Sequence, residues 1–98
     1  MAQVLNAAGV SQALSTIDGW AGDQTGISKT VELPSFPAAI NVVVRVAEVA
    51  EAMDHHPDID IRWRTLSFRC ATHSAGGVTR RDIDLAGRID DILGTVRP

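Results

Sequence analysis

Residues 58–70, Asp-Ile-Asp-Ile-Arg-Trp-Arg-Thr-Leu-Ser-Phe-Arg-Cys, decide the fold of this chain. Apolar and polar side chains alternate along residues 59–63, and after a turn near residues 64–65 the alternation resumes over residues 66–70. A period of two is typical of a strand with one buried face. Two strands joined by so short a turn form an antiparallel hairpin. The sequence therefore predicts an antiparallel sheet with one apolar face, on which Trp63 lies.

The longest predicted helix lies directly upstream, from Ser35 to Asp54. Ser35 is a candidate N-cap, and Pro37 falls near the first turn, where its missing N–H is not needed. Two apolar stripes follow this helix, one made of Phe36, Ile40, Val43, Ala47 and Ala50 and the other of Val42, Val46, Val49 and Met53. Because one stripe is enough to cover a sheet, the second is predicted to face another subunit. The alternative is a helix buried more deeply in the core of its own chain.

The remaining elements complete an α+β pattern. Apolar residues at helical spacing predict a first helix over residues 6–17, and residues 25–33 are predicted to be extended. Thr79-Arg80-Arg81-Asp82 resembles a capping box that opens a last helix, whose buried face would be Ile83, Ala86, Ile89 and Leu93. The predicted order is helix, strand, strand, helix, strand, strand, helix. We therefore expect one domain over residues 1–98, a four-stranded antiparallel sheet with three helices packed on one face.

Composition narrows the possible functions. The net charge is −3 and basic residues do not cluster, so direct nucleic-acid binding is not expected. Asn41, Arg45 and Glu48 interrupt the apolar stretch at residues 38–49, which excludes it as a membrane span. Cys70 is the only cysteine, which fits a reducing cytoplasm, and the N-terminus does not resemble a secretory signal. A chain of 98 residues buries a small core, so we expect it to gain stability as a homo-oligomer.

The segment Glu51-Ala52-Met53-Asp54-His55-His56-Pro57 holds two of the three histidines where the long helix must stop. Pro57 disfavours a helical conformation in the residue before it, which predicts a helix end at His55 or His56. Glu51 lies one turn before His55, so its carboxylate is predicted to reach that imidazole. The third histidine, His73, ends the next strand-like run. Three imidazoles within one short stretch are suited to proton transfer near neutral pH.

The spacing of these residues resembles that of the pterin-4a-carbinolamine dehydratases. The shared pattern, in order, is Glu51, His55-His56-Pro57, Trp63, His73 and Asp82. Residues 72–79 (THSAGGVT) and 82–90 also look like the strand-loop-helix segment of that family. The close match covers roughly residues 35–93. The resemblance implies a four-stranded sheet with three helices, assembled as a dimer or tetramer.

The resemblance also implies an activity, the dehydration of a 4a-hydroxytetrahydropterin to quinonoid dihydropterin and water during tetrahydropterin recycling. Histidine general acid/base catalysis is sufficient for this reaction, so no metal or cofactor is expected. The residues implied as catalytic are His55, His56, His73 and Asp82. Those implied to contact the substrate or to support the histidines are Glu51, Asp54, Pro57, Trp63, Thr72 and Ser74. Asp82 is expected both to cap the last helix and to orient His73.

Other interpretations remain open at this point. The histidine pair could simply decorate a helix end, Asp82 could serve only as a cap, and Trp63 could belong to the core. A zinc site of His55, His56 and His73 is conceivable, but adjacent helical residues point about 100° apart and no fourth ligand is suitably spaced. A non-enzymatic role is the other alternative, because some members of the family stabilise dimers of a transcription factor.

Overall fold

A computed structural model describes residues 3–97, and its centre is a single antiparallel sheet. The strands are β1 (Ala21–Asp23), β2 (Gly26–Glu32), β3 (Asp58–Arg62) and β4 (Thr65–Cys70), in the spatial order β1-β2-β4-β3. Within the β3–β4 hairpin, Ile59 lies opposite Phe68 and Ile61 opposite Leu66. The predicted hairpin is therefore confirmed. A further strand, β1, forms around Gly22, where the sequence pattern indicates no particular strand.

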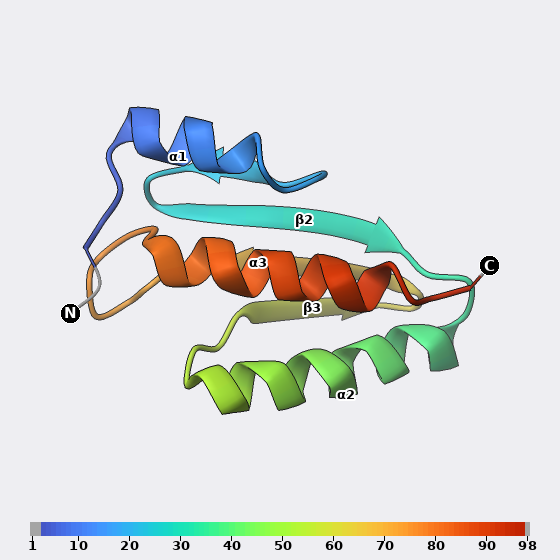
Figure 1. Ribbon diagram of the computed structural model, residues 1–98. Coiled ribbons are helices and arrows are strands. Elements are labelled where there is room, and N and C mark those ends of the chain that lie inside the picture. Colours follow the sequence, from blue (N-terminus) through green and yellow to red (C-terminus); the bar gives the residue numbers. More distant parts are fainter. Residues whose placement is uncertain (1–2, 98) are drawn as a thin grey trace.

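Three helices cover one face of the sheet: α1 (Ala7–Leu14), α2 (Phe36–Met53) and α3 (Arg80–Leu93), as Figure 1 shows. Between α3 and the sheet, Leu85 and Ile89 belong to the same buried cluster as Ile27, Leu66 and Phe68. The opposite face of the sheet is polar, with residues such as Ser28, Thr30 and Arg69 exposed. The predicted α+β architecture is confirmed.

Each helix begins at a polar N-cap. The side chains of Asn6, Ser35 and Thr79 accept backbone N–H groups that have no partner within the first turn. The predicted capping box of α3 is present, since Asp82 Oδ2 accepts the N–H of Thr79 at 2.9 Å. The first helix is shorter than predicted and ends at Leu14.

The second helix also ends earlier than predicted, at Met53, and Pro57 is not the cause. Asp54 adopts the left-handed conformation, with φ 51° and ψ 44°. Its N–H then bonds the carbonyl of Glu51 (3.1 Å), and the N–H of His55 bonds that of Ala50 (3.0 Å). These two bonds form a Schellman motif, which usually has glycine where Asp54 stands. The helix therefore stops before the histidine pair, and both histidines belong to the segment that leads into β3.

The apolar stripes of α2 do not divide between core and partner as expected. Val42 and Val46 are buried in the core of the chain, so Val46 cannot face another subunit. In the other stripe Phe36 is 49% exposed while Ala50 is buried, and Val44, which lies in neither stripe, is 51% exposed. The large apolar side chains that α2 exposes are therefore Phe36 and Val44.

The prediction for Trp63 is wrong. Trp63 has φ 54° and sits in the turn between β3 and β4, with 70% of its surface exposed. The guanidinium carbon of Arg64 lies 4.8 Å from the ring centroid. A left-handed residue leaves the strand alternation, so the ring leaves the apolar face of the sheet. Trp63 therefore belongs neither to the core nor to the histidine site.

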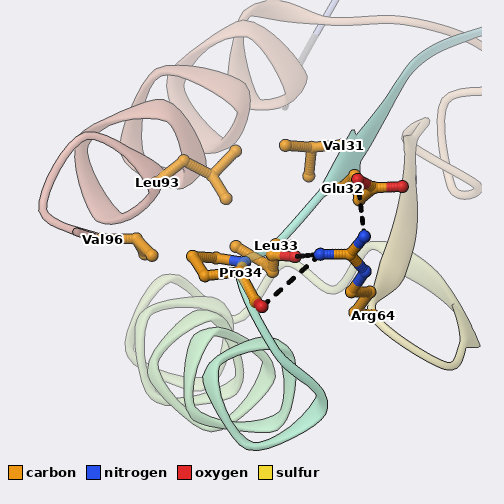
Figure 2. Close-up of a pocket in the computed structure, with 7 residues that line it drawn as sticks. All are labelled: Val31, Glu32, Leu33, Pro34, Arg64, Leu93 and Val96. Carbon is orange, nitrogen blue, oxygen red and sulfur yellow. Dashed lines mark hydrogen bonds and ion pairs between the residues drawn. The ribbon is translucent and has the colours of Figure 1, made fainter. Parts of the chain in front are cut away.

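Hollows lie at both ends of the sheet. One, of about 500 Å³, lies beside the end of β2 and the last turn of α3, and Figure 2 shows its mostly apolar walls of Val31, Leu33, Pro34, Leu93 and Val96 with Arg64 and Glu32 at one side. The other lies between the segment after α2 and the start of α3. Figure 1 shows these two helix ends on the left. Within residues 3–97, each helix is too short or too polar to traverse a lipid bilayer.

Candidate active site

The hollow between the end of α2 and the start of α3 has a volume of about 420 Å³ and is lined mainly by polar residues. It brings together all three histidines, although His73 comes from the loop after β4 and the other two precede β3. The lining residues are Asp54, His55, His56, Pro57, Asp58, Ala71, Thr72, His73, Ser74 and Arg81. Seven of the residues expected at the site are in this set, and Asp82 lies directly behind it.

His55 is held by Asp82. The two side chains are 7% and 0% exposed, and Nε2 of His55 lies 2.6 Å from Oδ1 of Asp82. Because an ionised carboxylate can only accept, the imidazole carries its proton on Nε2 and donates it to Asp82. Nδ1 has no hydrogen bond within residues 3–97. It is also not fully buried, because the only buried side-chain nitrogen or oxygen without a partner in these residues is Nε of Arg64. Nδ1 therefore contacts solvent. His55 therefore has one fixed nitrogen and one that a ligand can reach.

A directed chain of hydrogen bonds supports Asp82. Oδ2 accepts the hydroxyl of Thr72 at 2.7 Å and the N–H of Thr79 at 2.9 Å. The Thr79 hydroxyl, which accepts the N–H of Arg81, can then donate to Thr72 across 2.7 Å. A buried carboxylate needs such partners, because desolvation without them is costly. Asp82 thus caps α3 as expected, but the histidine that it orients is His55, and the expectation for His73 is wrong.

His56 is in a different environment. Its Nε2 lies 2.9 Å from Oε1 of Glu51, and both side chains are largely exposed. The sequence predicted that the carboxylate of Glu51 contacts His55, because it places the two residues one turn apart on a continuous helix. The left-handed turn at Asp54 rotates the chain, so that His56 and not His55 faces Glu51. Surface pairs of this kind are weak, so His56 can readily release Glu51 when a ligand binds.

His73 sits on a loop that is tightly closed at its base. The N–H of Thr72 bonds the carbonyl of Gly77 at 3.0 Å, and Gly76 has φ 79°, a conformation that favours glycine. The imidazole itself is exposed and has no side-chain partner within residues 3–97. The loop therefore holds His73 at the same hollow as His55 and His56.

Sequence reasoning missed Arg81, Asp58 and Ala71 as residues that line the site. For Arg81 a signal existed, because a cation in the first turn of a helix opposes the positive end of the helix dipole. Such a residue is expected to have a compensating partner. Arg81 Nη2 in fact donates to the carbonyls of Met53 (2.6 Å) and Asp54 (3.0 Å).

No group of three or more His, Cys, Asp or Glu side chains among residues 3–97 is arranged to hold a metal ion. For His55 and His56 the hydrogen bonds show which ring nitrogens are already engaged. Nε2 of His55 is directed at Asp82 and Nε2 of His56 at Glu51. The nitrogens that commonly bind zinc are thus engaged by carboxylates.

Comparison with known proteins identifies the family. The family model of pterin 4 alpha carbinolamine dehydratase matches residues 3–92. A relative from Roseiflexus castenholzii is 52% identical over 95% of this chain and all of its own, and one from Nocardia farcinica is 57% identical over 85% of this chain and 87% of its own. Both carry the name pterin-4-alpha-carbinolamine dehydratase as a provisional assignment.

Solved structures agree in fold. A Brucella melitensis protein described as a transcriptional coactivator/pterin dehydratase superposes with a TM-score of 0.86, at 30% identity, over 90% of this chain and 96% of its own. A pterin dehydratase-like protein described as a RuBisCO assembly factor has a TM-score of 0.63 at 17% identity, over 76% of this chain and 87% of its own, and shows the shared fold alone. The match of the family model over most of the sequence shows that this chain belongs to the pterin-4a-carbinolamine dehydratase family.

Proposed function

We propose that this protein is a hydro-lyase that dehydrates a 4a-hydroxytetrahydropterin to quinonoid dihydropterin and water. The observation that carries the proposal is the buried contact of 2.6 Å between His55 and Asp82, at the wall of a hollow that two further histidines line. A histidine held by a carboxylate is a common arrangement for general acid/base work. The volume of about 420 Å³ is within the range of small-molecule sites.

The reaction needs two proton transfers and no net oxidation. An acid protonates the 4a-hydroxyl, the N5 lone pair expels it as water, and a base removes a proton from the pterin. The C4a–O bond breaks while a C=N bond forms at C4a and N5, so that water is the only other product. Imidazoles with a pKa near neutrality can serve as both acid and base.

The contacts support different roles for the three histidines. Asp82 fixes the Nε2 proton of His55, which leaves Nδ1 as the nitrogen that exchanges a proton with the substrate. The imidazole of His73 has no hydrogen-bond partner among the described residues and serves as the second proton-transfer group. His56, whose pairing with Glu51 is exposed, mainly holds the pterin. Asp54, Pro57, Thr72 and Ser74 complete the walls.

The direct test is a dehydratase assay with a freshly generated 4a-hydroxytetrahydropterin. The substrate also dehydrates without enzyme, so the rate must rise in proportion to protein concentration. The His55→Ala/His73→Ala double variant, which we expect to be inactive, is the matched control. If the wild-type protein gives no more acceleration than this control, the proposed activity is wrong.

A second candidate function is a protein-binding scaffold, which the exposed apolar residues of α2 favour. Phe36 and Val44 are each about half exposed, so α2 has an outer surface with large apolar side chains, and such side chains can take part in an interface. The Brucella relative is described as a coactivator as well as a dehydratase.

We propose that the main role of this α2 surface is homo-oligomerisation. We also propose that the protein works in the cytoplasm, where its single cysteine, Cys70, remains a thiol.

A further inference from the structure

Arg81 connects the two helices that frame the histidine site. It comes from the first turn of α3, immediately before Asp82, and its Nη2 donates to the carbonyls of Met53 (2.6 Å) and Asp54 (3.0 Å) at the end of α2. No ion pair of Arg81 exists within residues 3–97, so these carbonyls are its principal partners. Two adjacent side chains of α3, Arg81 and Asp82, thus hold one short segment of the chain.

Apart from Arg81, the carbonyls of Met53 and Asp54 have no hydrogen-bond partner within residues 3–97. The Schellman motif satisfies Ala50 and Glu51, and the left-handed turn at Asp54 leaves the carbonyls of Met53 and Asp54 outside the helix. A guanidinium is well suited to them, because it is always charged and rigid and the last carbonyls of a helix carry partial negative charge. Arg81 therefore stabilises a conformation that aspartate adopts less readily than glycine.

The position of His55 depends on that conformation. The carbonyl of Asp54 belongs to the peptide bond that leads into His55, so rotating it would move the Cα–Cβ bond of His55 relative to Asp82. The His55–Asp82 distance of 2.6 Å leaves little tolerance for such a movement. We propose that Arg81 is a positioning residue of the site, which fixes the Asp54–His55 peptide so that His55 meets Asp82. This proposal rests on the proposed dehydratase function for its kinetic consequences but not for its structural ones.

The test compares Arg81→Met with Arg80→Met. Both variants lose one positive charge in the first turn of α3, but Arg80 is exposed and its side chain makes no hydrogen bond or ion pair within residues 3–97. We expect Arg81→Met to lower kcat about 10- to 100-fold with little change in KM, because small misplacements of a catalytic group are costly. Arg80→Met should resemble the wild type. Arg81→Lys, which keeps a charge and donors but lacks the planar fork, should recover part of the lost kcat.

A spectroscopic measurement separates this proposal from the dehydratase assignment. The Nε2 proton of His55, shielded by Asp82, should give a slowly exchanging downfield NMR signal, which the His55→Gln variant assigns. Arg81→Met should broaden or abolish this signal, Arg81→Lys should partly restore it, and Arg80→Met should leave it unchanged. If the wild type gives the NMR signal but has no dehydratase activity, the dehydratase proposal fails. The effect of the Arg81 variants on the signal then still tests the positioning role of Arg81. If Arg81→Met and Arg81→Lys both keep the wild-type signal and kcat, the positioning role is wrong.

Discussion

His55 and Asp82 are 27 positions apart in the sequence, yet their side chains form the shortest histidine–carboxylate contact among residues 3–97, at 2.6 Å. The contact joins the segment after α2 to the first turn of α3. It places a capping residue and a candidate catalytic histidine in one buried network with Thr72 and Thr79. A single carboxylate therefore links the stability of α3 to the geometry of the site.

Asp82→Asn should separate these two roles. The amide oxygen can still accept the N–H of Thr79, but an uncharged group cannot stabilise an imidazolium at His55. We expect kcat to fall roughly 10²- to 10⁴-fold, since general acid/base catalysis contributes on this scale. Unfolding free energy should fall by only about 1–3 kcal/mol. Steady-state kinetics and urea unfolding measure the two effects, and Asp84→Asn, an exposed position in the same helix, is the control.

The three histidines should differ in kinetic effect. His55→Ala and His73→Ala should lower kcat, each by roughly 10- to 1000-fold. His56→Ala should mainly raise KM, as expected for the loss of binding that is equal in ground and transition states. Because the two stereoisomers at C4a present the hydroxyl to opposite faces, His55 and His73 could serve one face each, and each variant should be assayed with each isomer. The largest fall in kcat at His56→Ala would contradict this division of roles.

Activity should not require a metal ion. Nε2 of His55 and Nε2 of His56 are engaged by carboxylates, and the proposed proton transfers need only imidazoles. Prolonged dialysis against a strong chelator should leave kcat and KM unchanged. Loss of activity that zinc alone restores would show that this prediction is wrong.

Self-association should depend on the exposed side of α2. Val44→Glu places a charge where half of the side chain is exposed, and it should lower the oligomeric state in sedimentation experiments while the monomer remains folded. Val46→Glu, two residues further along, should instead unfold the chain, because Val46 is fully buried and an unpaired buried charge is very costly. Wild-type protein that sediments as a monomer at micromolar concentration would exclude the interface.

Stability at high pH should depend on Cys70. Burial, followed by the charges of Asp82 and Asp58, raises the pKa of the thiol from 9.0 to about 12. The folded chain then keeps its proton at pH values where the unfolded chain loses it. Unfolding free energy should therefore fall as the pH rises from about 9 toward about 12, by at most about 1.4 kcal/mol per pH unit. Cys70→Ala should show a shallower fall over this range, and equal slopes for the two proteins would contradict the assignment.

Local patterns were sufficient to predict the elements of the fold apart from the position of β1. The alternation along residues 58–70 predicted the β3–β4 hairpin, because a strand with one buried face must repeat every two residues. Ser35 and Thr79 marked helix starts, because a free N–H of the first turn needs a nearby acceptor. Trp63 fits the same alternation, and the sequence therefore predicted that its side chain is buried. This prediction was wrong, because apolar periodicity does not reveal that the backbone of Trp63 is left-handed.

The sequence by itself determined the order of the elements, the family pattern and seven of the residues that line the hollow, because spacing, capping and apolar periodicity are local properties of the chain. Only the tertiary structure decided which partners meet. Because of the left-handed turn at Asp54, Glu51 pairs with His56 and not with His55. The packing of α3 on the sheet places Asp82 next to His55 and Arg81 next to the end of α2. These pairings depend on the directions of side chains from different elements, which are fixed when the core packs and not by the distance between residues in the sequence.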